Sequence, residues 1–95
     1  MYIRLVRGQA QAGQVEELAR RWQGFWGEQM PQVPGFRHAY FGPGQEPNAI
    51  VSISVWDQRP DHATMEPLMH QFQSQIRDIS ANPPAVEEFE TLADF

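Results

Sequence analysis

The chain contains no cysteine and no lysine. Without cysteine it cannot form disulfides, thiolate nucleophiles or cysteine-bound iron–sulfur clusters. All seven basic residues are arginine, and the twelve acids leave a net charge of −5. This acidic balance disfavours binding to a nucleic-acid backbone, because such binding gains its affinity from clustered cations.

Long apolar runs are absent as well. No stretch reaches the roughly 18 apolar residues that span a bilayer, so no membrane partner is expected. The opening segment, Met1 to Arg7, has two arginines inside its apolar run, which is a poor signal peptide. No glycine-containing stretch continues into the Gly-Lys-Ser/Thr of a phosphate-binding loop. We therefore expect an intracellular, cytoplasmic protein.

The 95 residues fit one domain, spanning positions 1–95. The apolar content of 41% is ordinary for a globular protein and excludes extensive disorder. A chain this short buries only roughly 60–65% of its unfolded surface, so association with another chain would add stability.

Hydrophobic patterning predicts four strands. Apolar residues of both parities in 2–7 indicate a strand that is covered on both sides. Segments 36–41 and 49–56 flank a short loop rich in glycine and proline, which predicts an antiparallel hairpin. The tail from Val86 to Phe95 alternates loosely and predicts a weak fourth strand.

Two helical regions are predicted between these strands. An apolar stripe at helical period covers 14–29, and Pro31 and Pro34 end it. Pro67 is not expected inside a helix, so the second region is predicted as a short turn near 58–65 and a main helix near 67–80. The Asn82-Pro83-Pro84 segment is expected to stop that helix.

The resulting β-α-β-β-α-β order predicts an α+β, ferredoxin-like domain with an antiparallel sheet and both helices on one face. The other face would then expose several large aliphatic side chains: Ile3, Leu5, Val51, Ile53 and Val55, or their alternates. Burying five such side chains is worth about 8–15 kcal/mol before association costs. A homodimer that pairs through the open sheet face is therefore predicted.

Several segments resemble one known family. They are Ala12-Gly13-Gln14-Val15-Glu16-Glu17-Leu18, Val33-Pro34-Gly35-Phe36 and Val55-Trp56-Asp57. Through them the chain resembles the antibiotic biosynthesis monooxygenase-like family of the dimeric α+β barrel superfamily. The resemblance implies a dimeric α+β barrel, and it includes no catalytic signature. Family members include cofactor-independent oxygenases of quinol-like or polyketide substrates, haem-degrading enzymes and proteins of unknown role.

The haem-degrading subgroup resembles this chain least. That subgroup uses an asparagine on the first strand, and a tryptophan and a histidine on the second helix. The first strand here has no asparagine and the second helix has no tryptophan. The helical wheel places His70 toward solvent, away from Phe72 and Met69. No haem is therefore expected, and the resemblance implies activity without metal or flavin.

Four residues are candidates for ligand binding on the predicted helix-covered face. Trp22 and Trp26 lie on the buried stripe of the first helix, as core aromatics or as one wall of an aromatic ligand pocket. Trp56 ends the third strand and either packs in the core or lines a cleft. Arg4 lies on a covered strand and needs a partner, either an acid of the other subunit or an anionic ligand.

His38 and Tyr40 are the candidate catalytic pair. They share a strand parity with Phe36, and if that parity faces the helices, both point into the cleft. An imidazole and a phenol would then serve a phenolic or quinoid oxygen, with His38 as the base. If the parity is reversed, Arg37, Ala39 and Phe41 face inward and the hypothesis fails.

His62 is a further candidate, since the helical turn that carries it could lie over the cleft; the alternative is a surface histidine. The three histidines have no metal-ligand spacing, so a metal site is not expected.

Three functions are compatible with the fold class. The first is a small cofactor-independent monooxygenase acting on a planar aromatic, quinol-like compound. The alternative is a non-catalytic, homodimeric module that binds a small molecule or acts as an accessory protein. An RNA-binding domain shares the element order but carries aromatic and basic residues on its open face, which this acidic chain lacks.

Overall fold

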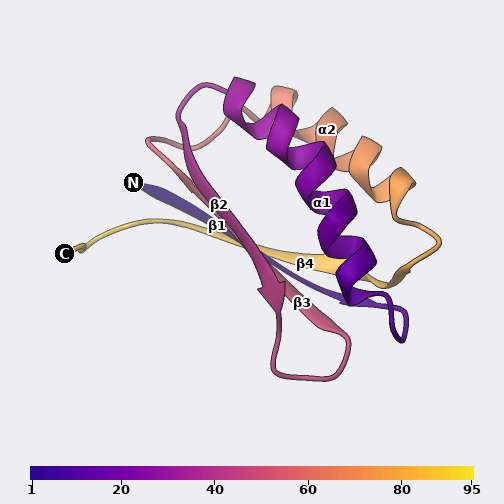
Figure 1. The fold of residues 1–95 in the computed structure, drawn as a ribbon. Coiled ribbons are helices and arrows are strands. Elements are labelled where there is room, and N and C mark those ends of the chain that lie inside the picture. Colours follow the sequence, from indigo (N-terminus) through magenta and orange to yellow (C-terminus); the bar gives the residue numbers. More distant parts are fainter.

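The computed structural model describes residues 1–95 and confirms the ferredoxin-like α+β fold. The elements are β1 (Tyr2–Ala10), α1 (Val15–Gln29), a 3-10 turn (Met30–Gln32), β2 (Phe36–Pro43), β3 (Ala49–Trp56), α2 (His62–Gln75) and β4 (Ser80–Glu90) (Figure 1). Neither helix has the length and apolar character needed to cross a membrane.

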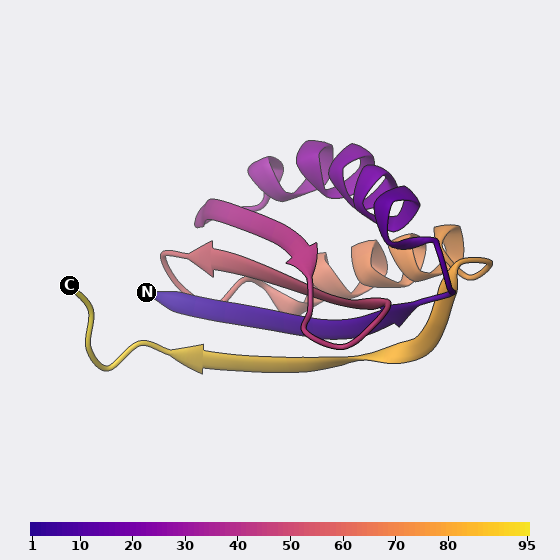
Figure 2. The same ribbon diagram turned by 60° about the horizontal axis from the view of Figure 1, so that its bottom comes forward.

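The four strands form one sheet in the order β2-β3-β1-β4, and every neighbouring pair is antiparallel. The predicted hairpin of β2 and β3 is confirmed. Both helices lie on the same side of the sheet (Figures 1 and 2). The sheet therefore has one helix-covered face and one open face.

Strand alternation assigns the side chains to these faces. Tyr2 pairs with Trp56 and Arg4 pairs with Ser54, and all four side chains are buried beneath the helices. The residues between them belong to the open face, where β1 and β3 present the predicted aliphatic set: Ile3, Leu5, Val51, Ile53 and Val55.

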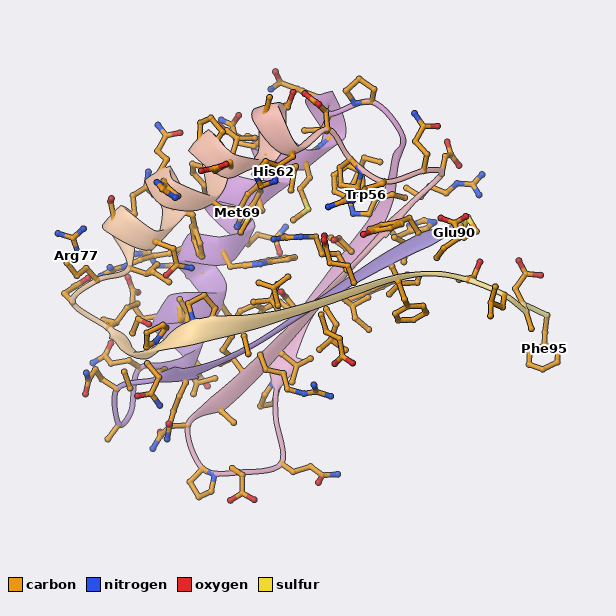
Figure 3. All side chains as sticks on the ribbon, turned by 180° about the vertical axis from the view of Figure 1, so that it is seen from behind. Trp56, His62, Met69, Arg77, Glu90 and Phe95 are labelled. Carbon is orange, nitrogen blue, oxygen red and sulfur yellow. The ribbon has the colours of Figure 1, made fainter.

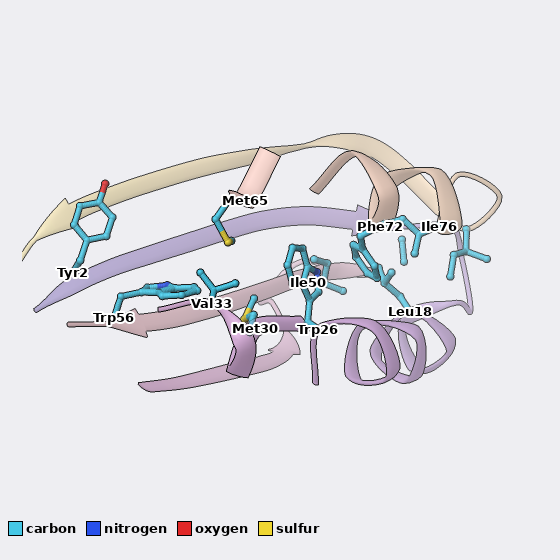
Figure 4. Close-up of a cluster of buried hydrophobic side chains, with 12 residues drawn as sticks. Tyr2, Leu18, Trp26, Met30, Val33, Ile50, Trp56, Met65, Phe72 and Ile76 are labelled. Carbon is cyan, nitrogen blue, oxygen red and sulfur yellow. The ribbon is translucent and has the colours of Figure 1, made fainter. Parts of the chain in front are cut away.

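Twelve buried apolar residues form the core between the sheet and the helices (Figure 4). Trp56 is fully buried there, and its Nε1 donates a hydrogen bond to Ser54 Oγ at 2.9 Å. The Phe36 ring meets it edge-on at 5.4 Å. Because the indole N–H is satisfied, Trp56 is buried without an unpaired donor.

Arg21 on α1 joins the two helices. Its guanidinium donates to the Gln75 carbonyl at 2.9 Å and to the Asp78 carboxylate at 2.8 Å and 3.2 Å, just beyond α2. It also pairs with Glu17 one turn earlier on α1, at 2.8 Å. These bonds join the middle of α1 to the C-terminal end of α2.

The prediction that Pro67 divides the second helical region was wrong. The helix α2 runs unbroken from His62 to Gln75 with Pro67 inside it, and it ends before the predicted residue 80. Met65 and Phe72, on either side of the proline, are both buried in the core. Packing of that apolar face outweighs the loss of one backbone hydrogen bond at an exposed position.

The sequence predicted that the Asn82-Pro83-Pro84 segment stops a helix, and this prediction was wrong. The segment lies in strand β4. The strand β4 is an edge strand, where prolines are tolerated. Neither proline has an N–H group to donate to β1. The β1–β4 register shifts at this point, between Arg7 and Ala10. The strand ends at Glu90 and leaves residues 91–95 outside the sheet.

Replacing Pro67 by alanine is expected to stabilise the protein. The change restores one helical hydrogen bond, which stabilises the folded state. It also removes the restriction that proline places on the unfolded chain, which opposes this effect, so the free energy of unfolding rises by a net amount of about 1–2 kcal/mol. Urea denaturation followed by circular dichroism measures the gain. The exposed Gln71→Ala on the same helix is the control, and an unchanged or lower stability of Pro67→Ala would contradict the prediction.

The Arg21 network also makes stability depend on pH. Hydrogen bonds from Arg20 and Arg21 hold the pKa of Glu17 at about 2, below its ordinary 4.5. A lowered pKa stabilises the fold above the unfolded value, and this contribution disappears as the pH falls toward the folded value. We expect Glu17→Gln to show a smaller drop in Tm than the wild type between about pH 5 and pH 2. Glu16→Gln, which removes a carboxylate without an ion pair, should leave that drop unchanged.

Candidate functional site

A cavity lies between the helix-covered face of the sheet and the two helices. The empty space of this cavity is about 760 Å³ when the part that opens to solvent is included. The enclosed part, which can hold the centre of a water-sized molecule, is about 70 Å³. The enclosed part is therefore smaller than the roughly 300–1,000 Å³ of most small-molecule sites, and its lining is mainly apolar, as in such sites.

The cavity exists because the floor is made of small residues. Ser52 and Ser54 on β3 and Gly8 on β1 lie on the covered face, between the larger Ile50 and Trp56. Their side chains do not reach the helices, so space remains above them. Above Gly8 the Ile50 side chain takes up part of this space, since a β-carbon at Gly8 would approach Ile50 Cδ1 to 3.2 Å.

The walls are aromatic. They are formed by Trp22 and Trp26 of α1, Phe41 of β2 and Phe72 of α2. The rings of Trp22 and Phe41 are 5.3 Å apart, and those of Trp26 and Phe72 are 5.9 Å apart. Both tryptophans singled out from the sequence therefore lie in the lining, where they present flat apolar surfaces to a planar ring.

Arg4 is the one ionisable side chain among the lining residues. Its side chain is only 8% exposed, and its Nε lies 3.5 Å from the Glu88 carboxylate of β4. Its Nη2 donates to the Met69 sulfur at 2.8 Å. Burial lowers the pKa of Arg4 and the Glu88 charge opposes that effect, but a guanidinium stays protonated in proteins. A permanent positive charge is thus held beside an apolar space, with an acid of the same chain as its partner.

The end of the cavity near the start of β4 is polar. Gln9, Ser80 and Asn82 contribute to the lining there, and the Asn82 amide donates to Gln9 Oε1 at 2.6 Å. Gln9 and Asn82 are exposed, so this end opens to solvent.

His38 and Tyr40 do not line the cavity, so of the two parities left open by the sequence the one that excludes this pair is found. Between Phe36 and His38 the β2–β3 register shifts by one residue, so Phe36 pairs with Trp56 while His38 pairs with Val55. This bulge reverses the parity, and His38 and Tyr40 lie on the open face with their rings stacked 6.3 Å apart. Tyr40 is 61% exposed.

Trp56 and His62 also lie away from the cavity. Trp56 is enclosed by the core and is absent from the lining. His62 begins α2 with an exposed side chain, and its Nε2 is 2.6 Å from Glu66 one turn later (Figure 3). Neither residue therefore lines the cavity.

Several lining residues were not identified from the sequence: Phe41, Ser52, Ser54, Met69, Phe72 and Gln73. The available signal was the size of Ser52 and Ser54. Two small residues on the covered parity of a central strand leave a gap that bulky neighbours cannot close.

Comparison with known proteins places this geometry in context. No family model and no curated protein matches the chain. Among solved structures, a Streptomyces coelicolor monooxygenase in complex with nanaomycin D is similar (TM-score 0.77, 14% identity, 99% of this chain and 89% of that one). SnoaB, a cofactor-independent oxygenase from Streptomyces nogalater, is similar over 98% of this chain and 94% of its own (TM-score 0.64, 18% identity).

A third similar structure is a protein from Nitrosomonas europaea named as a putative antibiotic biosynthesis monooxygenase (TM-score 0.74, 14% identity, 96% of this chain and 89% of that one). At such identities the likeness establishes the fold alone. The chain therefore has the fold of the antibiotic biosynthesis monooxygenase proteins, in agreement with the resemblance seen in the sequence.

Proposed function

We propose that this protein binds a planar aromatic, quinol-like compound in the cavity and oxygenates it without metal or flavin. The observation that carries the proposal is the cavity itself, which has four aromatic walls and a buried guanidinium on its floor. The fold shared with monooxygenases, one of them cofactor-independent by name, supports the same class of chemistry.

The chemistry requires an electron-rich substrate. An ionised phenolic ring gives an electron to O2 directly, and the radicals combine into a hydroperoxide that loses water. Overall, the phenolic O–H, one ring C–H and O2 become two carbonyl groups and H2O, with all electrons supplied by the substrate. The protein contributes position through Trp22 and Phe41, charge through Arg4, and exclusion of water through the helices.

The alternative is a binding module without turnover. The observation in its favour is that no histidine, tyrosine or carboxylate is among the lining residues, so the cavity supplies no general base. A binding module predicts that aromatic ligands raise the Tm and leave oxygen consumption at the uncatalysed rate.

We also propose that two copies pair through the open face. Besides the aliphatic set of β1 and β3, this face exposes 61% of Tyr40 and 51% of Phe89. Contiguous apolar surface of this kind is rare on small monomers, and a second copy offers a complementary one.

Oxygen uptake with a dihydronaphthoquinone tests the oxygenase. We expect consumption above the uncatalysed rate, and at least a tenfold loss in Ser52→Phe, which fills the cavity floor. His38→Ala, on the open face, should keep the wild-type rate. Oxygen uptake at the uncatalysed rate together with a raised Tm would favour the binding module. The absence of both catalysed uptake and a raised Tm would reject the cavity as a binding site.

Light scattering in dilute solution tests the pairing. We expect the mass of two 10.9 kDa chains for the wild type and of one for Ile53→Glu, because the new charge would be buried at the centre of the interface. Gln71→Glu adds the same charge on the exposed side of α2 and should remain paired. A folded wild type with the mass of one chain would contradict the proposal.

A further inference from the structure

Arg4 has hydrogen-bond donors that the protein does not use. A guanidinium carries five N–H groups. In Arg4, Nε faces Glu88 and Nη2 donates to Met69, while no protein acceptor bonds to Nη1. No fully buried side-chain nitrogen or oxygen lacks a partner. Nη1 therefore retains some accessible surface, and Arg4 is one of the residues that line the cavity.

The existing partners neutralise Arg4 only weakly. The distance of 3.5 Å between Nε and Glu88 exceeds the roughly 2.7–2.9 Å of a strong charge-assisted hydrogen bond. Glu88 is also 28% exposed, so solvent screens its charge. The Met69 thioether is a weak acceptor. The edge of the guanidinium that faces the cavity thus keeps an attraction for a second anion.

The floor beside Arg4 offers further donors. Ser54 pairs with Arg4 across the β1–β3 ladder, and its oxygen already accepts the Trp56 hydrogen bond. Its own hydroxyl hydrogen has no protein acceptor and is free to donate. Ser52 makes no side-chain hydrogen bond, and no carboxylate lines the cavity. This set of groups favours an oxygen that carries negative charge.

We propose that the cavity selects the ionised form of an aromatic hydroxyl, with the phenolate oxygen on Arg4 and Ser54 and the ring among the aromatic walls. The proposal rests on the proposed function and specifies its substrate, because the phenolate is the form that gives an electron to O2. Glu88 moderates the selection, since its charge opposes a second anion beside Arg4.

The probe is 4-nitrophenol, whose ionised form absorbs visible light and which O2 does not oxidise. Absorbance titration gives the pKa of the bound probe. We expect it to lie at least one unit below that of the free probe, which corresponds to at least tenfold tighter binding of the phenolate. The neutral 4-nitrotoluene has a similar shape and reports on ring binding alone.

Arg4→Met should reduce the preference for the phenolate to less than about twofold and leave 4-nitrotoluene affinity within about threefold. The matched control is Arg7→Met. Arg7 lies on the same strand and pairs with Glu87 of β4 at 3.2 Å, but it is exposed on the open face. The Arg7→Met substitution should not change the pKa of the bound probe. Glu88→Gln should lower that pKa further, by removing the opposing charge.

A bound pKa equal to or above the free value, with 4-nitrotoluene still bound, would overturn this inference and leave the proposed function intact. No saturable binding of either probe would overturn both. A lowered pKa without oxygen uptake in the quinol assay would support the anion site and reject the oxygenase. If Arg4→Met does not fold, the wild-type titration and the Glu88→Gln variant still decide.

Discussion

The charge of Arg4 is the constraint on which the rest of the cavity depends. It sits on a central strand, beneath the helices, where an arginine cannot shed its proton. The strand order places the groups it needs on both sides: Glu88 opposite it on β4 and Ser54 opposite it on β3. The space beside this charge is mainly apolar, so the guanidinium relies on Glu88 and Met69 as its contacts within the protein.

Much of the fold could be predicted because local pattern and tertiary packing agree. The strand β3 follows from the alternation of its side chains, and α1 follows from an apolar stripe that faces the core, with Leu18 and Trp26 buried. The predictions failed where the two conflict. Pro67 and the Pro83-Pro84 pair break local rules, and only the packing of Met65 and Phe72, or the position of β4 at the edge, explains why they are tolerated.

Part of the site could be predicted from the sequence for the same reason. Arg4, Trp22 and Trp26 follow from the parity of β1 and the period of α1, and all three reach the cavity. His38 and Tyr40 do not, because one extra residue in β2 reverses every side chain after it. The alternation of side chains in the sequence of β2 does not predict that bulge. It arises where Phe36 packs against Trp56, a contact between distant parts of the chain.

The two prolines of β4 have a consequence for how copies of the chain can meet. A strand edge with free N–H and C=O groups can recruit another strand, and that strand presents a new edge, so growth has no natural end. Neither of the two successive prolines has an N–H group, so this part of β4 offers no donor to a foreign strand. Lateral addition of a foreign strand is thereby interrupted halfway along this border, which biases the molecule toward assemblies that close on themselves and away from fibres.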